Sequence, residues 1–232
     1  KNNNRYIGSV KNSKLDGKGE LHFTTAEPQV KYRKKGIWND GFFTGDAYIP
    51  MGKSGYYQGQ IQKDKRQGEG YMKYDDGAFY DGNWENDAKS GRGKHTWPDG
   101  SYHDGEWKNG SINGSGIRVL KGQSTWKCNW KDGVPTDSGE VIYNNGAYYR
   151  GGVGGRKDGN DVYYFPEGFG RFYMKFQSAD SSMRNDSSYT GYYKEGKRHG
   201  KGIYTRVNNG EMYSEIYDGN WVNGERNGSG KL

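Results

Sequence analysis

The chain has 232 residues with a formal net charge of +7, and 40 glycines, 21 tyrosines and 7 tryptophans dominate its composition. So many aromatic rings exclude an unstructured chain, because disordered segments are poor in them, and no nucleic-acid-binding motif accompanies the positive charge, so no nucleic-acid partner is expected. The single cysteine, Cys128, excludes an intramolecular disulfide framework and fits a reducing compartment, and no apolar run approaches the roughly 20 residues that a membrane-spanning helix needs.

A glycine register runs along the chain. The repeated segment is an aromatic residue, a glycine two positions on and a second aromatic two further, as in Tyr80–Trp84 (Tyr-Asp-Gly-Asn-Trp). We take this glycine as the register mark of its repeat, and consecutive marks are 23 residues apart from Gly36 to Gly151. A fixed period of this length indicates an array of about nine repeats. The marks are Gly8, Gly36, Gly59, Gly82, Gly105, Cys128 in place of glycine, Gly151, Gly191 and Gly219.

Each repeat is predicted to be a β-hairpin. Side chains alternate between two faces along Tyr80–Trp84 and again along Gly91–Trp97, and a period of two is the signature of a strand. A Gly-x-Gly pair, such as Gly91 and Gly93, lies nine and eleven residues after most marks. Because a ring lying across a strand needs backbone without a Cβ beneath it, we expect Tyr and Trp of one hairpin to lie over the Gly-x-Gly of the next.

The predicted hairpins follow one another in chain order. The first spans residues 6–23, and a longer connection over residues 24–30 leads to the regular repeats of residues 36–120. The next repeat, Trp126–Trp130, keeps both aromatic residues but has Cys128 at the glycine position. Little helix is expected, because no segment combines helical periodicity with capping residues.

The pattern Tyr-x-Gly-x-Trp-x-x-Gly-x-x-x-Gly-x-Gly resembles the MORN repeat (membrane occupation and recognition nexus). The resemblance is clearest over Tyr189–Gly202 and Tyr217–Gly230 and covers nearly the whole chain. We therefore expect an all-β fold, an elongated, single-layer, twisted antiparallel sheet of about nine MORN-type β-hairpins that forms an open, solenoid-like array.

One array is expected to occupy residues 1–232. Its regular repeats span residues 1–128, and irregular repeats with insertions span residues 129–232. The spacing is interrupted over residues 154–167, and the Ser-, Asp- and Asn-rich segment 177–188 is predicted to be a surface loop.

No catalytic residue, metal site or cofactor is predicted. The four histidines lie in different repeats, and no carboxylate or thiol completes a metal-binding set with the usual spacing. Cys128 occupies a glycine position without a base linked to it in the sequence, so a small-residue replacement is favoured over a nucleophile. The chain is therefore expected not to be an enzyme.

The aromatic residues of the register form the first candidate binding surface. Two interpretations stay open for each ring: it belongs to the core, or it lines a groove, because a single-layer sheet cannot cover both of its faces. A partner's helix or extended peptide would lie in such a groove, held by aromatic anchors. The candidate groove residues are Tyr57, Tyr80, Trp84, Trp107, Trp130, Tyr149, Tyr193, Tyr217 and Trp221.

Basic hairpin turns form the second candidate surface. Cations near an anionic membrane surface contribute about 1 kcal/mol each to binding. The alternative is that the turns are solvated and that their lysines deter edge-to-edge aggregation. The candidate residues for anionic lipid are Lys63, Lys65, Arg66, Lys197, Arg198 and Lys201.

The family resemblance implies a non-catalytic scaffold or adaptor that binds protein partners. Such a protein would be a structural component of a larger cytoskeletal or axonemal assembly, similar to radial-spoke components, in the cytoplasm or cilium. The alternative is a peripheral membrane-targeting module that binds acidic phospholipids through the basic turns.

Overall fold

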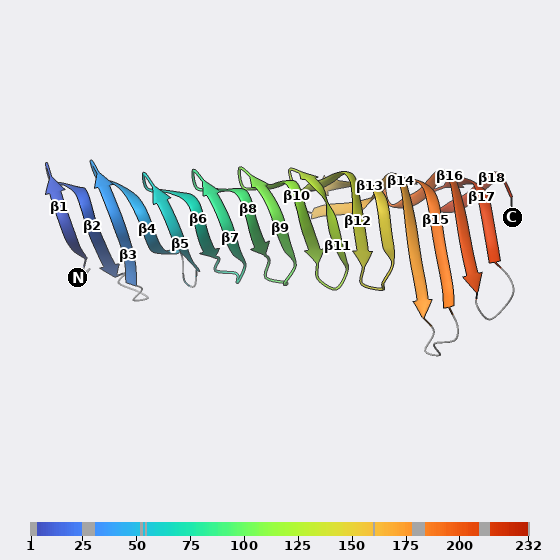
Figure 1. Cartoon of the computed structure of the whole chain (residues 1–232), viewed down its shortest axis with the longest axis horizontal. Helices are drawn as coiled ribbons and strands as arrows, with labels where there is room; N and C mark the ends of the chain where they lie inside the picture. The colour runs from blue at the N-terminus through green and yellow to red at the C-terminus, as the bar shows by residue number, and fades with distance from the viewer. Residues whose placement is uncertain are drawn as a thin grey trace. The chain divides into compact units, whose positions relative to one another are not determined.

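The computed structural model describes residues 4–24, 31–51, 53, 55–159, 161–177, 184–208 and 214–231. These residues form 18 β-strands and no helix, and the strands pair antiparallel as successive hairpins (Figure 1). The predicted all-β fold, an open antiparallel array of about nine hairpins, is therefore confirmed.

The chain divides into two compact units, Lys1–Ser111 and Ile112–Leu232, which we call the N-terminal and C-terminal units. The expected change from regular to irregular repeats, between residues 128 and 129, therefore lies inside the C-terminal unit. Within each unit consecutive strands pair with each other and form one layer (Figure 1).

The strands of the N-terminal unit are β1 (Arg5–Lys11), β2 (Lys14–Thr24), β3 (Lys31–Asn39), β4 (Phe42–Met51), β5 (Gly55–Gln62), β6 (Lys65–Lys73), β7 (Phe79–Glu85), β8 (Ala88–Thr96) and β9 (Tyr102–Lys108). Those of the C-terminal unit are β10 (Ser111–Leu120, which begins one residue before the boundary), β11 (Ser124–Lys131), β12 (Val134–Tyr143), β13 (Tyr148–Asp158), β14 (Asp161–Gln177), β15 (Arg184–Lys194), β16 (Lys197–Asn208), β17 (Ser214–Val222) and β18 (Glu225–Lys231).

A tyrosine ring lies over a pair of glycines in most hairpins. Gly82 of β7 pairs with Gly93 of β8, and a Cβ added to Gly93 would lie 2.5 Å from Cζ of Tyr80. The Tyr80 hydroxyl donates a hydrogen bond to the carbonyl of Asn83 at 2.9 Å, which fixes the ring in this position. The same tyrosine arrangement recurs at Tyr6, Tyr57, Tyr149, Tyr189 and Tyr217.

Where a repeat has tryptophan two residues after its mark, this ring contacts the preceding hairpin. Nε1 of Trp84 donates to the carbonyl of Gly70 at 3.0 Å, and Nε1 of Trp107 donates to Gly93 at 2.8 Å. The expectation that rings lie over the next hairpin is therefore wrong: the tyrosine lies over glycines of its own hairpin, and the tryptophan contacts the hairpin before it. Most marks pair with the second glycine of their own hairpin, as Gly82 does with Gly93, so the tyrosine covers that pair and the tryptophan contacts the hairpin before.

The first glycine of each Gly-x-Gly pair has a different role. Gly91 has φ 63°, in the left-handed region, beside the register shift between Gly82 and Trp84. In the Cys128 repeat this position is Asp137, with φ 64°. Aspartate tolerates the left-handed conformation, which explains why this repeat keeps the hairpin without the glycine.

Edge-to-face ring contacts join the hairpins on one face, which we call the ring face; the opposite face is the outer face. In the N-terminal unit the ring centroids of Tyr80 and Trp84 are 5.2 Å apart, and those of Tyr80 and Trp107 are 5.5 Å apart, with interplanar angles of 88° and 82°. Such pairs contribute about 0.5–1.5 kcal/mol each beyond the area they bury. Rings on bare backbone thus take the place of an aliphatic core.

The insertions lengthen strands in the C-terminal unit. Residues of 154–167 extend the β13–β14 hairpin, whose pairing continues from Val153 with Pro166 to Asp158 with Asp161. The prediction of a loop over residues 177–188 is wrong at both ends, because Gln177 lies in β14 and residues 184–188 lie in β15. Residues 178–183 lie outside the described residues.

Replacing Gly93 with alanine should destabilise the fold more than the same change at Gly77. The new methyl of Gly93→Ala would overlap the Tyr80 ring, at a cost of about 3 kcal/mol. Gly77 has φ 92° and no atom within 4 Å of its Cβ position, so Gly77→Ala should cost about 1 kcal/mol of backbone strain. Urea unfolding of both variants checks this, and equal losses would contradict ring-on-glycine packing.

Candidate functional site

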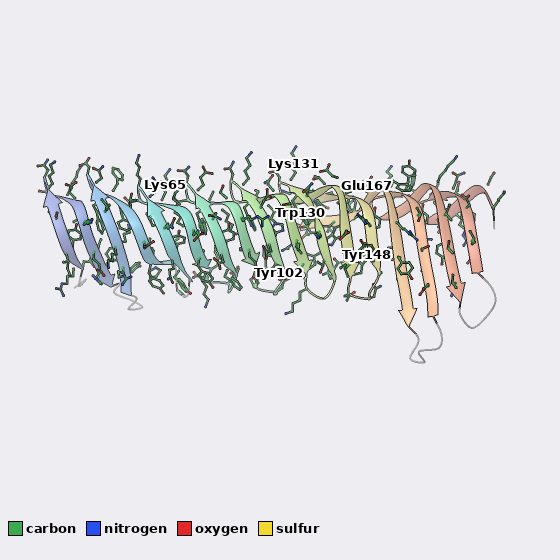
Figure 2. The ribbon with its side chains drawn as sticks, in the orientation of Figure 1. Lys65, Tyr102, Trp130, Lys131, Tyr148 and Glu167 are labelled. Atoms are coloured by element: carbon green, nitrogen blue, oxygen red, sulfur yellow. The ribbon has the colours of Figure 1, made fainter. Side chains whose placement is uncertain are left out.

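The nine aromatic residues proposed as groove residues are all buried. Their exposed fractions run from 0% at Tyr80 and Tyr149 to 7% at Tyr193. The structure therefore places them in the core, the first of the two interpretations, and a partner on the ring face would meet the residues that cover them. Figure 2 shows one of them, Trp130, within the sheet.

One residue in most hairpins occupies a fixed place on the ring face, opposite the strand that carries the mark, and we call it the cap. It pairs with the residue two positions after the mark, as Lys89 pairs with Trp84 and Arg226 with Trp221. The caps identified by this pairing are Leu15, Phe43, Arg66, Lys89, Pro135, Pro166, Arg198 and Arg226.

Four caps are cations stacked on rings. The guanidinium carbon of Arg66 is 4.3 Å from the ring centroid of Trp84, and that of Arg198 is 4.4 Å from Trp221. Cation–π contacts of this kind contribute about 0.5–2 kcal/mol. Sequence reasoning missed the caps as a group, although their constant distance of seven residues from most marks could have identified them.

The cap positions correct part of the predicted lipid surface. Arg66 and Arg198 are half-buried over core rings. Lys63, Lys65 and Lys197 are exposed in or beside turns, and Figure 2 shows Lys65 at the turn edge of the N-terminal unit. The six predicted residues are therefore not one surface.

Lys201 lies on the outer face, away from the turn lysines. It pairs with Asn220 and is exposed, whereas the adjacent Gly200 pairs with Trp221 of the ring face.

Carboxylates interleave with the cations along the turn edge of the N-terminal unit. Asp64 forms an ion pair with Lys34 at 3.1 Å, and Asp87 forms one with Arg66 at 3.1 Å. The Arg66 hydrogen bonds and charge hold the pKa of Asp87 below its usual value, although partial burial acts in the opposite direction. The basic turns are therefore partly neutralised.

Lys89 is enclosed by aromatic rings. Its Nζ is 4.8 Å from the Trp107 ring centroid, 5.0 Å from that of Tyr80, and 2.9 Å from Nδ1 of His95. Burial, and secondarily the charge of Arg66, lowers the pKa of Lys89 to about 8. The amine is therefore easier to neutralise than an ordinary lysine.

Cys128 can occupy a glycine position because the tyrosine that would lie over this glycine is also replaced in its repeat. Trp126 stands two residues before the mark, and its Nε1 donates to Ser124 Oγ at 2.8 Å instead of lying over paired glycines. Burial raises the pKa of the Cys128 thiol to about 12. At neutral pH the sulfur is therefore a protonated thiol and a poor nucleophile.

A hollow of about 930 Å³ lies in the C-terminal unit. Its lining lies largely on β14, β15 and β16, of 17, 11 and 12 residues, which extend past the shorter β11 and β12 (Figure 1), and includes Gly196 and Gly224 in turns. Half-buried apolar side chains and two arginines line it: Tyr143, Phe172, Met174, Tyr204, Arg198 and Arg206.

Comparison with known families identifies the repeats. The MORN repeat model matches residues 6–25, 57–79, 80–102, 103–125, 189–211 and 217–232. These segments make up more than half of the chain, so the chain belongs to the MORN-repeat family. A comparison with curated proteins gives no match.

The family model leaves three repeats unmatched, those marked by Gly36, Cys128 and Gly151. The structure shows that these are hairpins too, formed by β3 and β4, β11 and β12, and β13 and β14. Each departs from the pattern: Lys34 replaces the tyrosine, Cys128 replaces the glycine, and the third contains the lengthened hairpin.

MORN repeats generally mediate protein or membrane-lipid interactions and occur in cytoskeletal and membrane-associated proteins. Within the described ranges, no group of three or more His, Cys, Asp or Glu residues could hold a metal ion. The described part of the chain also contains no helix that is long and apolar enough to cross a membrane.

Stability should depend on pH through Lys89. Its pKa is 10.5 in the unfolded chain and about 8 in the folded one, so between these values the unfolded state binds more protons. The free energy of unfolding should therefore rise with pH across this window, while below about pH 8 both states are protonated and the contribution is constant.

Urea midpoints of wild type and Lys89→Met, measured below and within this window, check the expectation. The rise should disappear in the variant, and identical pH curves for the two proteins would contradict it. The measurements should stay below pH 10, because burial raises the pKa of Tyr57 and Tyr189 from 10.0 to about 12, which makes stability fall with pH above that point.

Proposed function

We propose that the chain is a non-catalytic scaffold or adaptor that binds a protein partner on its ring face. The partner's helix or extended peptide lies in the hollow of the C-terminal unit. The observation that carries this proposal is the hollow itself, in which the apolar side chains of Tyr143, Phe172, Met174 and Tyr204 lie beside Arg198 and Arg206.

The chemistry of the hollow fits protein recognition. Aromatic residues, methionine and arginine are the types enriched where proteins meet. Tyr189 and Tyr193, which form its floor, are themselves fixed by ring contacts at 5.2 Å, so the surface is preorganised.

The buried groove residues take an indirect part in this proposal. Rings such as Tyr193 and Trp221 hold the ring face rigid and support the cap Arg198, while the cationic caps and half-buried side chains form the accessible surface. MORN repeat proteins are generally non-enzymatic scaffolds, which supports the same function. Consistent with this, we propose a place in a cytoskeletal or axonemal, radial-spoke-like assembly in the cytoplasm or cilium.

The second candidate is a peripheral module that binds acidic phospholipids. Exposed Lys63, Lys65 and Lys197 favour it, as does the membrane association of other MORN proteins. The paired carboxylates Asp64 and Asp87 on the same edge as the first two lysines reduce their net charge, so we rank this function second.

Site-specific photocrosslinking tests the scaffold function. A photoreactive amino acid replaces Tyr204, which lines the hollow, or the adjacent Ile203, which is 45% exposed on the outer face. In extract of the source cells, we expect protein crosslinks from position 204 and few from position 203. Equal crosslinking from both positions, or none from 204, would contradict a partner on the ring face.

Sedimentation with phosphatidylserine vesicles separates the two functions. If the chain acts as a scaffold, we expect no binding to these vesicles that depends on the turn lysines. Salt-sensitive binding that is lost in a Lys63→Gln, Lys65→Gln, Lys197→Gln variant would establish the lipid function instead.

A further inference from the structure

The cationic caps differ in the group that neutralises them. Arg66 donates from Nε to Asp87 Oδ1 at 3.1 Å and from Nη2 to the Asp87 carbonyl at 2.8 Å. Arg226 forms an ion pair with Glu215. Both guanidinium groups therefore combine ring stacking on one side with a carboxylate on another.

Arg198 has the rings but lacks the carboxylate. It stacks on Trp221, Tyr204 and Tyr189 at 4.4, 5.2 and 5.6 Å from the three ring centroids. The residue of the next repeat that corresponds to Asp87, five positions after the mark, is Gly224, whose N–H donates to the Arg198 carbonyl at 2.9 Å. Among the described residues no carboxylate forms an ion pair with Arg198.

Arg198, which has no carboxylate partner, cannot become neutral by losing its proton. The buried lysine cap, Lys89, has no carboxylate partner in contact either, but its pKa falls to about 8. A guanidinium stays protonated in proteins, so the charge of Arg198 persists at the floor of the hollow. A charge held among rings gains more from an anionic partner than one in bulk water.

The remaining charges of the hollow do not supply that anion. Asp186 lines it, and its Oδ2 accepts a hydrogen bond from the Tyr173 hydroxyl at 3.0 Å while its Oδ1 has no hydrogen-bond partner, but among the described residues no ion pair joins Asp186 to Arg198. Glu215, which pairs across the strands with Arg206, forms its ion pair with Arg226. Arg206 and Lys197 add two exposed cations to the lining.

We propose that the hollow binds a peptide segment in which a carboxylate side chain stands beside apolar residues. The carboxylate pairs with Arg198, replacing the aspartate that Arg66 has, and the apolar residues pack on Tyr143, Phe172, Met174 and Tyr204. This inference rests on the proposed scaffold function and adds the chemical class of the partner. The bidentate geometry of arginine and carboxylate gives the segment its register in the hollow.

Selection from a random-peptide display library on the full chain tests the proposal. Peptides retained by the wild type should carry Asp or Glu next to apolar residues. Changing that acid to its amide should weaken binding by about tenfold or more, because a charged hydrogen bond is lost. Arg198→Met should weaken the acidic peptide equally, and in this variant the amide change should have no further effect.

Arg66→Met is the matched control, because Arg66 is a stacked cap of the N-terminal unit, and neither Arg66 nor the Trp84 ring on which it stacks lines the hollow. It should leave peptide affinity unchanged, and circular dichroism should show that both variants fold. Retained peptides without an acid, or affinity unaffected by Arg198→Met, would overturn the proposal.

The outcomes also separate this proposal from the scaffold function. Peptides whose binding is lost in Tyr204→Ala but kept in Arg198→Met would preserve the scaffold function and overturn the carboxylate site. If no peptide is retained by the hollow, both fail. Phosphatidylserine vesicles that bind the wild type and not Arg198→Met would assign the site to a lipid headgroup and overturn the peptide proposal.

Discussion

A tyrosine ring that lies on two facing glycines determines how this chain can fold. The Tyr80 ring covers Gly82 and Gly93, and its hydroxyl bonds to the backbone three residues on. Any side chain on either glycine would displace the ring, and loss of the ring would expose bare backbone. Most hairpins are thus closed by one local interaction, and where a repeat has tryptophan, a hydrogen bond such as that from Trp84 to Gly70 joins it to the hairpin before.

This packing also determines where a binding surface can form. Because the register rings are buried in holding the sheet together, the surface that we propose for recognition consists of the cationic caps and the half-buried residues beside them. In the N-terminal unit the caps Arg66 and Lys89 are satisfied within the chain, by Asp87 and His95. In the C-terminal unit a hollow lies beside Arg198, and among the described residues this cap has no carboxylate partner. We propose that a partner supplies one there.

The repeat pattern was sufficient to predict the hairpins, the ring face and the family, because the period of 23 residues places the aromatic residues and glycines of the register on the same side of the sheet. It did not predict which hairpin each ring covers, since that depends on the pairing of Gly82 with Gly93 rather than on spacing. The sequence likewise predicted Arg66 and Arg198 only as cations of turns, because their contacts with core rings depend on strand pairing. The sequence did not predict the hollow, because the irregular spacing of the later repeats does not show how far β14–β16 extend.

The most direct test of ring-on-glycine packing is the NMR chemical shift of glycine Hα protons. Gly70, Gly93 and Gly202 lie under tyrosine rings, whereas Gly77 and Gly146 have no atom within 4 Å of their Cβ positions. We expect ring currents to move the Hα signals of the first three well upfield and to leave the last two near ordinary glycine values. Indistinguishable shifts in the two groups would contradict the structure's central interaction.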